Sequence, residues 1–300
     1  MSKNGEILSQ LIENDFGIKG HDRWLKSSEH DSLVVDVDKG IFFWNSKDVV
    51  GDPIIYLTKV RGMPFKDATA YLSTLGYTGT HVWTMESGGD EIVVYPKLVE
   101  IFFESGRDKR DYFYRRGLTD STIDRMQLGW YNGWNTVPFF EDGTFRNFQF
   151  RMDNPSKRIK SYYKGLGALL FNSDVLRLVN EVFWCEGPID AMILIQNGIP
   201  AVSSNIGGGF KPEWYSKFIN IERIWLVMDH DLAGDNESKK LAEFFGTSKC
   251  KIYNFWDFEE KGYDPVDYFR DEHTKDEFIE LVNNNSKYLF EMEKYKRSKK

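Results

Sequence analysis

Two acidic clusters, each placed directly after a short apolar run, constrain this sequence more than any other feature. The first run, Val182–Cys185, is followed by Glu186, and the second, Ile224–Met228, is followed by Asp229 and Asp231. Short runs rich in β-branched and aromatic residues are typical of buried parallel strands. We therefore predict two strands of one parallel sheet, each of which ends in carboxylates.

A helical pattern follows each of these two strands. Pro188 suits the first position of a helix that ends at Asn197-Gly198, and the second helix ends at Gly246. Between them, Ile199–Ser203 has the composition of a further strand. Strands that alternate with helices predict crossover connections and an α/β fold, in which ligands bind at the carboxyl ends of the strands. The two acidic clusters should therefore share one site.

Carboxylates that share a site repel one another, and burying them without partners costs free energy. A divalent cation removes that cost. Oxygen ligands in a loose cluster suit Mg²⁺ or Mn²⁺, which also bind substrate phosphates. A single cluster would favour ordinary solvated loop charges. Two clusters in order, each at a strand-to-loop edge, favour a metal site for phosphoryl chemistry.

Both clusters resemble the Toprim domain of bacterial-type primases, topoisomerases and some nucleases. Glu186-Gly187-Pro188-Ile189-Asp190 has the pattern Glu-Gly-x-x-Asp, and Asp229-His230-Asp231-Leu232-Ala233-Gly234 has the pattern Asp-x-Asp-x-x-Gly. Tyr263-Asp264-Pro265-Val266-Asp267 resembles the third acidic segment of primases, which is often Asp-Pro-Asp. The resemblance implies that Glu186, Asp229 and Asp231 are catalytic and bind metal together with Asp264, Asp267 or both. It also implies that Asp190 supports the first turn or a water beside the metal.

Length and composition set further bounds. A chain of 300 residues allows two or three domains, and its net charge of −7 excludes a basic protein that wraps nucleic acid over its whole surface. Cys185 and Cys250 are the two cysteines, too few for a four-thiolate zinc site, and they indicate no disulfide framework. With no apolar run long enough to span a membrane, we expect a cytoplasmic protein, in the host cytoplasm if the source is viral.

The first 78 residues resemble the zinc-ribbon domain that begins bacterial-type primases and helps to select the template. The four zinc ligands of that family would fall near Arg23, Lys26, Trp44 and Lys47, none of which binds zinc. We therefore expect no zinc, and expect Phe42, Phe43 and Trp44 to fill its place. The three cations among these residues could instead contact phosphates, or could serve solubility alone.

The middle of the chain resembles the primase catalytic core. Asp111–Leu118 is similar to a helix that ends on Arg-Gly-Leu, and Phe148 and Arg151 match a Gly-Phe-x-x-Arg strand in which Asn147 replaces the glycine. In Lys157–Lys164, cations alternate with aromatic residues, as suits single-stranded nucleic acid. The residues implied to hold nucleic-acid or nucleotide phosphates are Arg146, Arg151, Lys160 and Lys164, with Arg115 and Arg116.

Together these matches identify the chain as a member of the bacterial-type (DnaG-like) DNA primases, of phage or mobile-element origin. The family implies synthesis of short RNA primers from ribonucleoside triphosphates on single-stranded DNA, with two divalent ions. It also implies a replicative helicase as partner, although we expect no helicase-binding domain in the short C-terminal region. A Toprim-type nuclease and a non-catalytic DNA-binding subunit remain alternatives, whereas a topoisomerase would need a catalytic tyrosine context that is not found.

The expected α/β architecture has a small α+β module at its start and five segments. These are a zinc-ribbon-like module (1–78), a connector (79–104), the N-terminal part of the catalytic core (105–180), the Toprim domain (181–270), and a C-terminal helix with a disordered basic tail (271–300).

Overall fold

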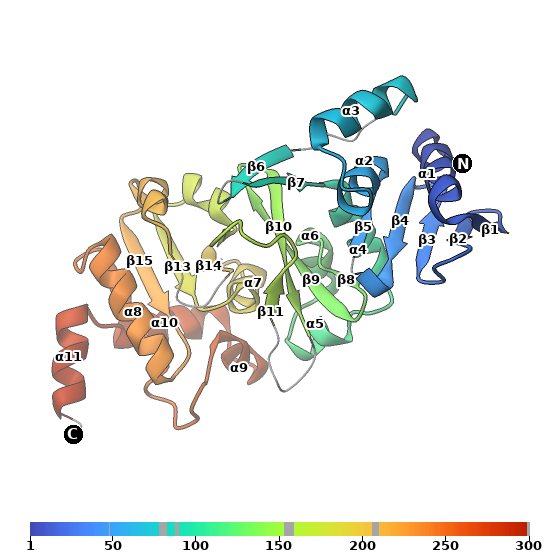
Figure 1. Ribbon diagram of the computed structural model, residues 1–300. Coiled ribbons are helices and arrows are strands. Elements are labelled where there is room, and N and C mark those ends of the chain that lie inside the picture. The colour runs from blue at the N-terminus through green and yellow to red at the C-terminus, as the bar shows by residue number, and fades with distance from the viewer. Residues whose placement is uncertain (48, 78–82, 88–89, 153–158, 206–209, 299–300) are drawn as a thin grey trace. The chain divides into compact units, whose positions relative to one another are not determined.

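The computed structural model describes most of the chain, and Figure 1 shows the course of its elements. The described residues are 1–47, 49–77, 83–87, 90–152, 159–205 and 210–298. The chain divides into two compact units, Met1–Trp83 and Thr84–Lys300. No helix in these described ranges is both long and apolar enough to cross a lipid bilayer.

The first unit packs helix α1 (Lys3–Phe16) against a five-stranded antiparallel sheet in the order β1-β2-β3-β4-β5. The strands are β1 (Ile18–His21), β2 (Trp24–Ser27), β3 (Leu33–Asp36), β4 (Ile41–Trp44) and β5 (Val49–Gly51). Short helices follow: α2 (Pro53–Ile55), a π-helical turn (Tyr56–Val60) and α3 (Phe65–Thr74). Asp52 precedes α2 as its N-cap, because its carboxylate accepts hydrogen bonds from the N–H groups of Ile54 and Ile55.

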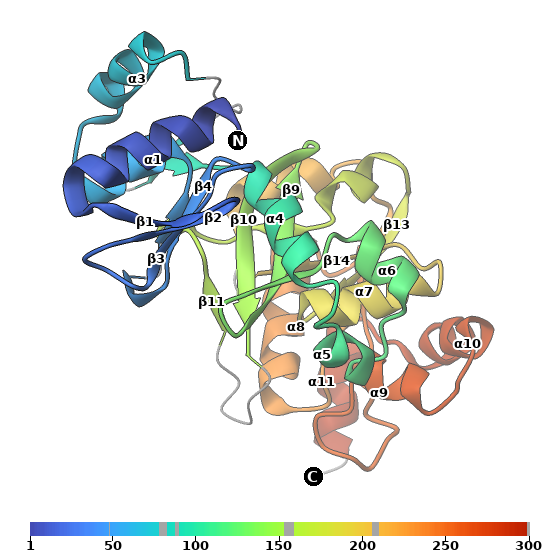
Figure 2. The same cartoon turned by 90° about the vertical axis from the view of Figure 1, so that its right-hand side faces the viewer.

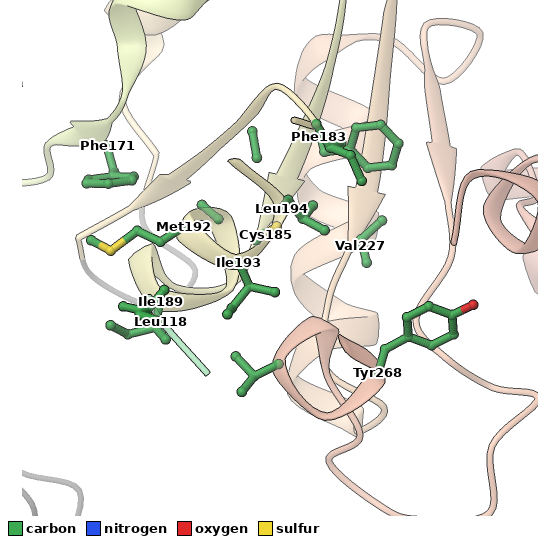
Figure 3. Packing of buried hydrophobic residues seen from close by; sticks show 14 of the residues in the cluster. Leu118, Phe171, Phe183, Cys185, Ile189, Met192, Ile193, Leu194, Val227 and Tyr268 are labelled. Atoms are coloured by element: carbon green, nitrogen blue, oxygen red, sulfur yellow. The ribbon is translucent and has the colours of Figure 1, made fainter. Parts of the chain in front are cut away.

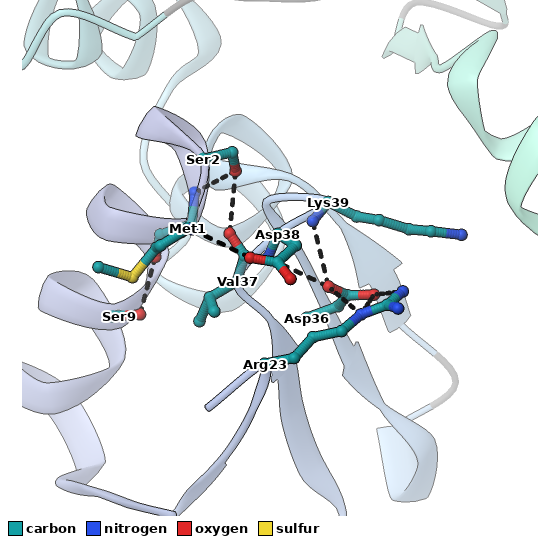
Figure 4. A network of polar contacts seen from close by, with 9 residues as sticks. Met1, Ser2, Ser9, Arg23, Asp36, Val37, Asp38 and Lys39 are labelled. Atoms are coloured by element: carbon teal, nitrogen blue, oxygen red, sulfur yellow. Dashed lines mark hydrogen bonds and ion pairs between the residues drawn. The ribbon is translucent and has the colours of Figure 1, made fainter. Parts of the chain in front are cut away.

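Two polar and aromatic arrangements occupy the region where a zinc ribbon binds its metal. Arg23 donates hydrogen bonds to the buried carboxylate of Asp36, which also accepts from the backbone N–H groups of Asp38 and Lys39, as Figure 4 shows. Although burial opposes ionisation of Asp36, these donors hold its pKa below the ordinary value. These donors thus offset the charge of the buried Asp36.

The second arrangement centres on Trp44, which is 1% exposed. Its ring lies 5.4 Å from that of Phe16 and 5.0 Å from that of His30, and the Lys47 ammonium lies 4.0 Å from the ring centroid. Phe42 and Trp44 fill the core as expected. The expectation for Phe43 was wrong, because its register places it on the opposite face of the sheet, half-buried and 6.3 Å from the ring of Trp24.

The second unit combines an antiparallel and a mostly parallel sheet, so the predicted α/β class is confirmed. The antiparallel sheet has the order β11-β10-β9-β8, with α4 (Lys97–Ser105) packed against it through Phe102 (Figure 2). Its strands are β8 (Gly129–Tyr131), β9 (Trp134–Glu141), β10 (Thr144–Arg151) and β11 (Ile159–Ser161). The predicted hairpin turn at Asp142-Gly143 joins β9 to β10, with positive φ at both residues.

The mostly parallel sheet has the order β12-β14-β13-β15-β16, and only β12 runs antiparallel to its neighbour. Its strands are β12 (Leu170–Phe171), β13 (Glu181–Cys185), β14 (Ala201–Ser204), β15 (Arg223–Val227) and β16 (Cys250–Ile252). The helices of this part are α7 (Pro188–Gln196), α8 (Leu232–Phe245), α9 (Pro265–Arg270), α10 (Lys275–Asn285) and α11 (Leu289–Ser298), with 3₁₀ turns at Ser173–Arg177 and Pro212–Phe218. The predicted strand-helix alternation is therefore present.

Alternate side chains of β13 enter opposite hydrophobic cores, which fixes the sheet between two layers. Phe183 and Cys185 pack on one side with α7 residues such as Met192 and with Val227 of β15, as Figure 3 shows. On the other side Trp184 is fully buried among aromatic rings. Those rings belong to Trp214, Phe218 and Phe245. Rigid packing on both faces holds the carboxyl end of β13 in place.

Some local predictions were wrong. The basic C-terminal tail was expected to be disordered, but Leu289–Ser298 forms α11. Thr119 does precede α6 (Asp120–Arg125), yet its hydroxyl does not cap that helix and instead lies within hydrogen-bonding distance of Gln196 and Thr122.

The connector contains a two-stranded sheet of β6 (Trp83–Ser87) and β7 (Asp90–Val94). α5 spans Asp111–Arg115.

Some predicted features lie outside the described residues. These are the turn at Thr78–Thr80, the two glycines of Ser87–Asp90, and Lys157 and Arg158 of the basic segment. The structure divides the chain into two compact units only. The predicted division into five segments is finer than this and remains a prediction.

We expect Trp44→Ala to destabilise the first unit by about 3–5 kcal/mol, because the change removes a fully buried aromatic ring and leaves a cavity. Urea unfolding followed by hydrogen exchange at β3 and β4 measures this loss. Trp24→Ala is the matched control, since Trp24 is 48% exposed on the same sheet. Equal effects of the two substitutions, or unfolding of this unit by a chelator, would contradict the assignment of Trp44 as its structural centre.

Candidate metal centre

The carboxyl end of the parallel sheet brings the two acidic clusters together. Cys185 of β13 and Val227 of β15 are paired in parallel register. Glu186 therefore lies one residue beyond the last paired residue of β13, and Asp229 lies two residues beyond the last paired residue of β15. The chain turns at once into α7 and α8, so both clusters stay at this edge of the sheet. This placement is the one that the sequence predicts.

The third acidic segment joins them through backbone pairing at His230. The His230 N–H donates to the Tyr263 carbonyl at 3.0 Å, and the Gly262 N–H donates to the His230 carbonyl at 2.9 Å. The His230 ring nitrogen Nδ1 also lies 3.3 Å from the Glu260 carbonyl. These contacts hold Asp264 beside the second cluster. Sequence reasoning missed the role of His230, because no local pattern signals a pairing between two loops about thirty residues apart.

Electrostatics show that the carboxylates crowd one another. Burial, followed by the charges of Asp190, Glu186, Asp264 and Asp231, raises the pKa of Asp229 to about 9. Burial and then Asp190 raise the pKa of Asp264 to about 7. Burial also raises the pKa of Asp190. Five carboxylates from three segments of the chain thus act on one another within a poorly solvated region.

Three of these carboxylates also stabilise helix N-termini. Asp190 accepts from the Gly187 N–H at 3.1 Å, Asp231 from the Gly234 N–H at 2.8 Å, and Asp264 from the Asp267 N–H at 2.8 Å. Such hydrogen bonds favour the charged form and lower a pKa. The pKa values of Asp190 and Asp264 are nevertheless raised. Helix capping alone therefore does not account for this cluster.

The donor set fits a hard divalent cation. It consists of carboxylate oxygens, and one of them, Asp190 Oδ1, is buried without a hydrogen-bond partner. A cation would relieve the repulsion that raises these pKa values. Within the described part of the chain, however, no three His, Cys, Asp or Glu side chains are already arranged as a metal site. Asp229 and Asp264 would have to ionise in order to hold an ion.

The structure places Asp264 and Asp267, which the sequence left as alternatives, in different surroundings. Asp264 is among the residues that raise the pKa of Asp229. Asp267 lies in the first turn of α9 and forms an ion pair with Arg270 at 2.5 Å. Asp264 is thus placed in the cluster, and Asp267 borders it.

Two predicted arginines face the acidic cluster. The Arg116 guanidinium lies 4.0 Å from Asp264 Oδ2. Burial opposes its charge, but Asp190 and Asp264 outweigh burial and raise the pKa of Arg116. Arg151 is the last residue of β10, and its positive charge lowers the pKa of Asp190, in opposition to burial. Arg151 Nη1 also lies close to Gly187, 3.9 Å from the position that a Cβ atom on this glycine would occupy. Both cations could hold phosphate beside a metal ion.

The other four predicted cations have different surroundings. Arg146 Nε lies 3.8 Å from Glu141 Oε2 of the neighbouring strand. The Lys160 ammonium stacks on Trp134 at 4.3 Å, and Lys164 and Arg115 are exposed. Arg116 and Arg151 are therefore the predicted cations that the structure brings to the carboxylates.

Gly234 is needed beside the second cluster. A Cβ at this position would lie 2.4 Å from the Asp229 carbonyl oxygen, a distance that no side chain tolerates. The glycine thus lets α8 begin directly against the backbone of Asp229. The pattern Asp-x-Asp-x-x-Gly contains this glycine, so the signal was present in the sequence.

Comparison with known proteins supports this geometry. Residues 183–269, which run from β13 to α9, match the Toprim-like family. The chain is 34% identical over 64 residues to an uncharacterised protein of Bacillus anthracis, covering 21% of this chain and 19% of the relative. It is 31% identical over 91 residues to the DNA primase of Chlamydia trachomatis, covering 27% and 15%. The chain spans less than a fifth of the length of these relatives.

Solved structures extend the similarity over the whole chain. The zinc-binding and RNA polymerase domains of Aquifex aeolicus primase have a TM-score of 0.55 at 16% identity, covering 97% of this chain and 87% of that chain. A DnaG primase catalytic domain bound to single-stranded DNA has a TM-score of 0.55 at 17% identity, covering 65% and 80%. Residues 183–269 thus form a Toprim-like region. The fold of the chain is that of the DnaG-like DNA primases.

We expect the free energy of unfolding of the metal-free protein to fall as the pH rises from about 4 to about 9. The folded chain keeps protons on Asp229 and Asp264 up to a pKa of about 9 and about 7, whereas unfolded aspartates ionise near pH 4. Stability from these groups is thus complete at low pH and is lost through that window. Asp229→Asn should flatten the profile measured by urea unfolding; an unchanged slope would contradict the crowding.

Proposed function

We propose that this protein is a DNA primase, which joins ribonucleotides into short primers on single-stranded DNA. The observation that carries the proposal is the convergence of five mutually repelling carboxylates at the carboxyl edge of a Toprim-like sheet. This cluster lies within the fold of the DnaG-like primases. The primase relative from Chlamydia trachomatis supports the same activity.

Glu186, Asp229 and Asp231, together with Asp264, would hold Mg²⁺ or Mn²⁺. When bound, such ions orient a 3′-hydroxyl and stabilise the leaving pyrophosphate. The protein's own contribution is to place these carboxyl groups at the edge of a sheet that is packed on both faces, and to exclude water by burial. Asp190 keeps the first turn of α7 in place through Gly187.

The cations would act on the substrates. Arg116 and Arg151, already beside the carboxylates, would hold the triphosphate and offset the charge that develops on its oxygens. Lys160, stacked on the ring of Trp134, combines a phosphate-binding cation with an aromatic surface suited to single-stranded DNA. A solved DnaG catalytic domain of the same fold binds single-stranded DNA, which supports this assignment.

We expect Glu186→Gln and Asp229→Asn to reduce primer synthesis to background while binding of single-stranded DNA persists, because each removes a metal-binding charge and leaves the cationic surfaces intact. Incorporation of labelled ribonucleotides on defined templates measures synthesis. Glu243→Gln on the exposed side of α8, where Glu243 lies 4.0 Å from Lys239, is a control with the same change of charge.

The products also separate the proposed activity from its alternatives. Short ribonucleotide oligomers support a primase, whereas a nicked DNA substrate would indicate a Toprim-type nuclease that uses the same carboxylates. DNA binding with no product in Mg²⁺ or Mn²⁺ would indicate a non-catalytic subunit. Full synthesis by either site variant would refute the assignment of the carboxylates.

A further inference from the structure

Strand β10 carries three polar side chains in a row on one face. Asn147, Gln149 and Arg151 occupy alternate positions, so they point the same way. Asn147 is 1% exposed and Gln149 is 4% exposed, although both are polar. Most buried amides have specific hydrogen-bond partners. Asn147 and the Nε2 of Gln149 have such partners, whereas Gln149 Oε1 has none. Those partners show what this face of the strand does.

The side-chain amide of Asn147 bonds both backbone groups of Tyr163, as the backbone of a neighbouring strand would. Its Nδ2 donates to the Tyr163 carbonyl at 2.8 Å, and its Oδ1 accepts from the Tyr163 N–H at 2.9 Å and from the Phe148 N–H at 2.8 Å. The primase pattern has glycine at this position, which has no side chain to make these bonds. The clamp is therefore a feature of this chain.

Asn205 holds the other end of the same segment. Its Oδ1 accepts from the Leu169 N–H at 2.7 Å, and its own N–H donates to the Leu169 carbonyl at 3.0 Å. Gln149 of β10 in turn donates to the Asn205 carbonyl at 2.7 Å. Asn147 is thus part of β10, and Asn205 is bonded to β10 through Gln149. The last residue of this strand, Arg151, faces the acidic cluster.

The segment between the clamps is the loop 164–168. It begins with the exposed Lys164, and it turns at Gly165 and Gly167, both with positive φ. The ammonium of Lys211 donates to the Leu166 carbonyl at 3.4 Å and occupies space beside Gly167, where a Cβ would lie 3.3 Å from its side chain. A short loop that is fixed at both ends, carries the exposed Lys164 and is contacted by the Lys211 ammonium is preorganised to bind an anion.

We propose that Asn147 and Asn205 are positioning residues that hold the loop 164–168 as a preformed phosphate-binding element, with Lys164 as its contacting cation. The ligand chemistry is a phosphate group, either of a nucleoside triphosphate or of a DNA backbone. This inference rests on the proposed function, and on the family resemblance that implies a phosphate-binding role for Lys164.

A double-mutant cycle tests the coupling between clamp and cation. Asn147→Gly, the residue of the primase pattern, is compared with Lys164→Ala and with the double variant. Affinities are measured separately for ATP with Mg²⁺ and for an oligothymidylate. For one of these two ligands, Asn147→Gly should weaken binding about tenfold in the otherwise native chain. The same substitution should have no effect on that affinity in the Lys164→Ala background, as expected of residues that act as one unit. The ligand whose affinity falls identifies the source of the phosphate.

Hydrogen exchange and a matched control keep the test decisive. Exchange at Tyr163 and Leu169 should accelerate in Asn147→Gly. Asn197→Ala removes an asparagine that makes a comparable side-chain bond to the Ile193 carbonyl at the end of α7, and it should leave both affinities unchanged. Additive effects of the two substitutions, or faster exchange with unchanged affinities, would overturn the proposal.

Because neither readout requires primer synthesis, the inference and the proposed function can fail separately. If the two substitutions are coupled but no primer is made, the positioning role of the asparagines is supported and the primase assignment fails. If primers are made but the substitutions are not coupled, only the positioning role is refuted.

Discussion

Repulsion among carboxylates at one edge of a parallel sheet is the constraint on which this structure depends. Strand ends that point the same way bring Glu186 and Asp229 together, and the pairing of two loops adds Asp264. Burial strengthens the repulsion, so Asp229 and Asp264 keep their protons to higher pH than free aspartates do. The rigid aromatic packing around Trp184 and the facing guanidiniums of Arg116 and Arg151 are what make such an arrangement tolerable.

Local sequence signals were sufficient wherever a structure depends on neighbouring residues. Pro188 and Gly246 mark the start of α7 and the end of α8 because their effects on the backbone are local. The inclusion of Asp264 in the cluster, the approach of Arg116 from α5, and the clamp formed by Asn147 each depend on contacts between distant segments. No spacing in the sequence reports such contacts, so these parts of the site required the structure.

The first unit is held together by an ion pair and by packing between aromatic rings. An ion pair neutralises the buried Asp36, and a ring-on-ring contact of Trp44 with Phe16 and His30 supplies the packing. Both arrangements draw on residues from separate strands and turns, as metal ligands do. The similarity to the Aquifex aeolicus primase domains is one of fold.

Proton release on metal binding tests the central claim most directly. If Mn²⁺ binds the crowded carboxylates, Asp229 and Asp264 must give up protons that they hold up to a pKa of about 9 and about 7. Titration of the protein with Mn²⁺ in a weakly buffered solution near neutral pH should therefore release protons into the solvent, and Asp229→Asn should reduce the release. Mn²⁺ binding without proton release, or equal release from the variant, would contradict the account.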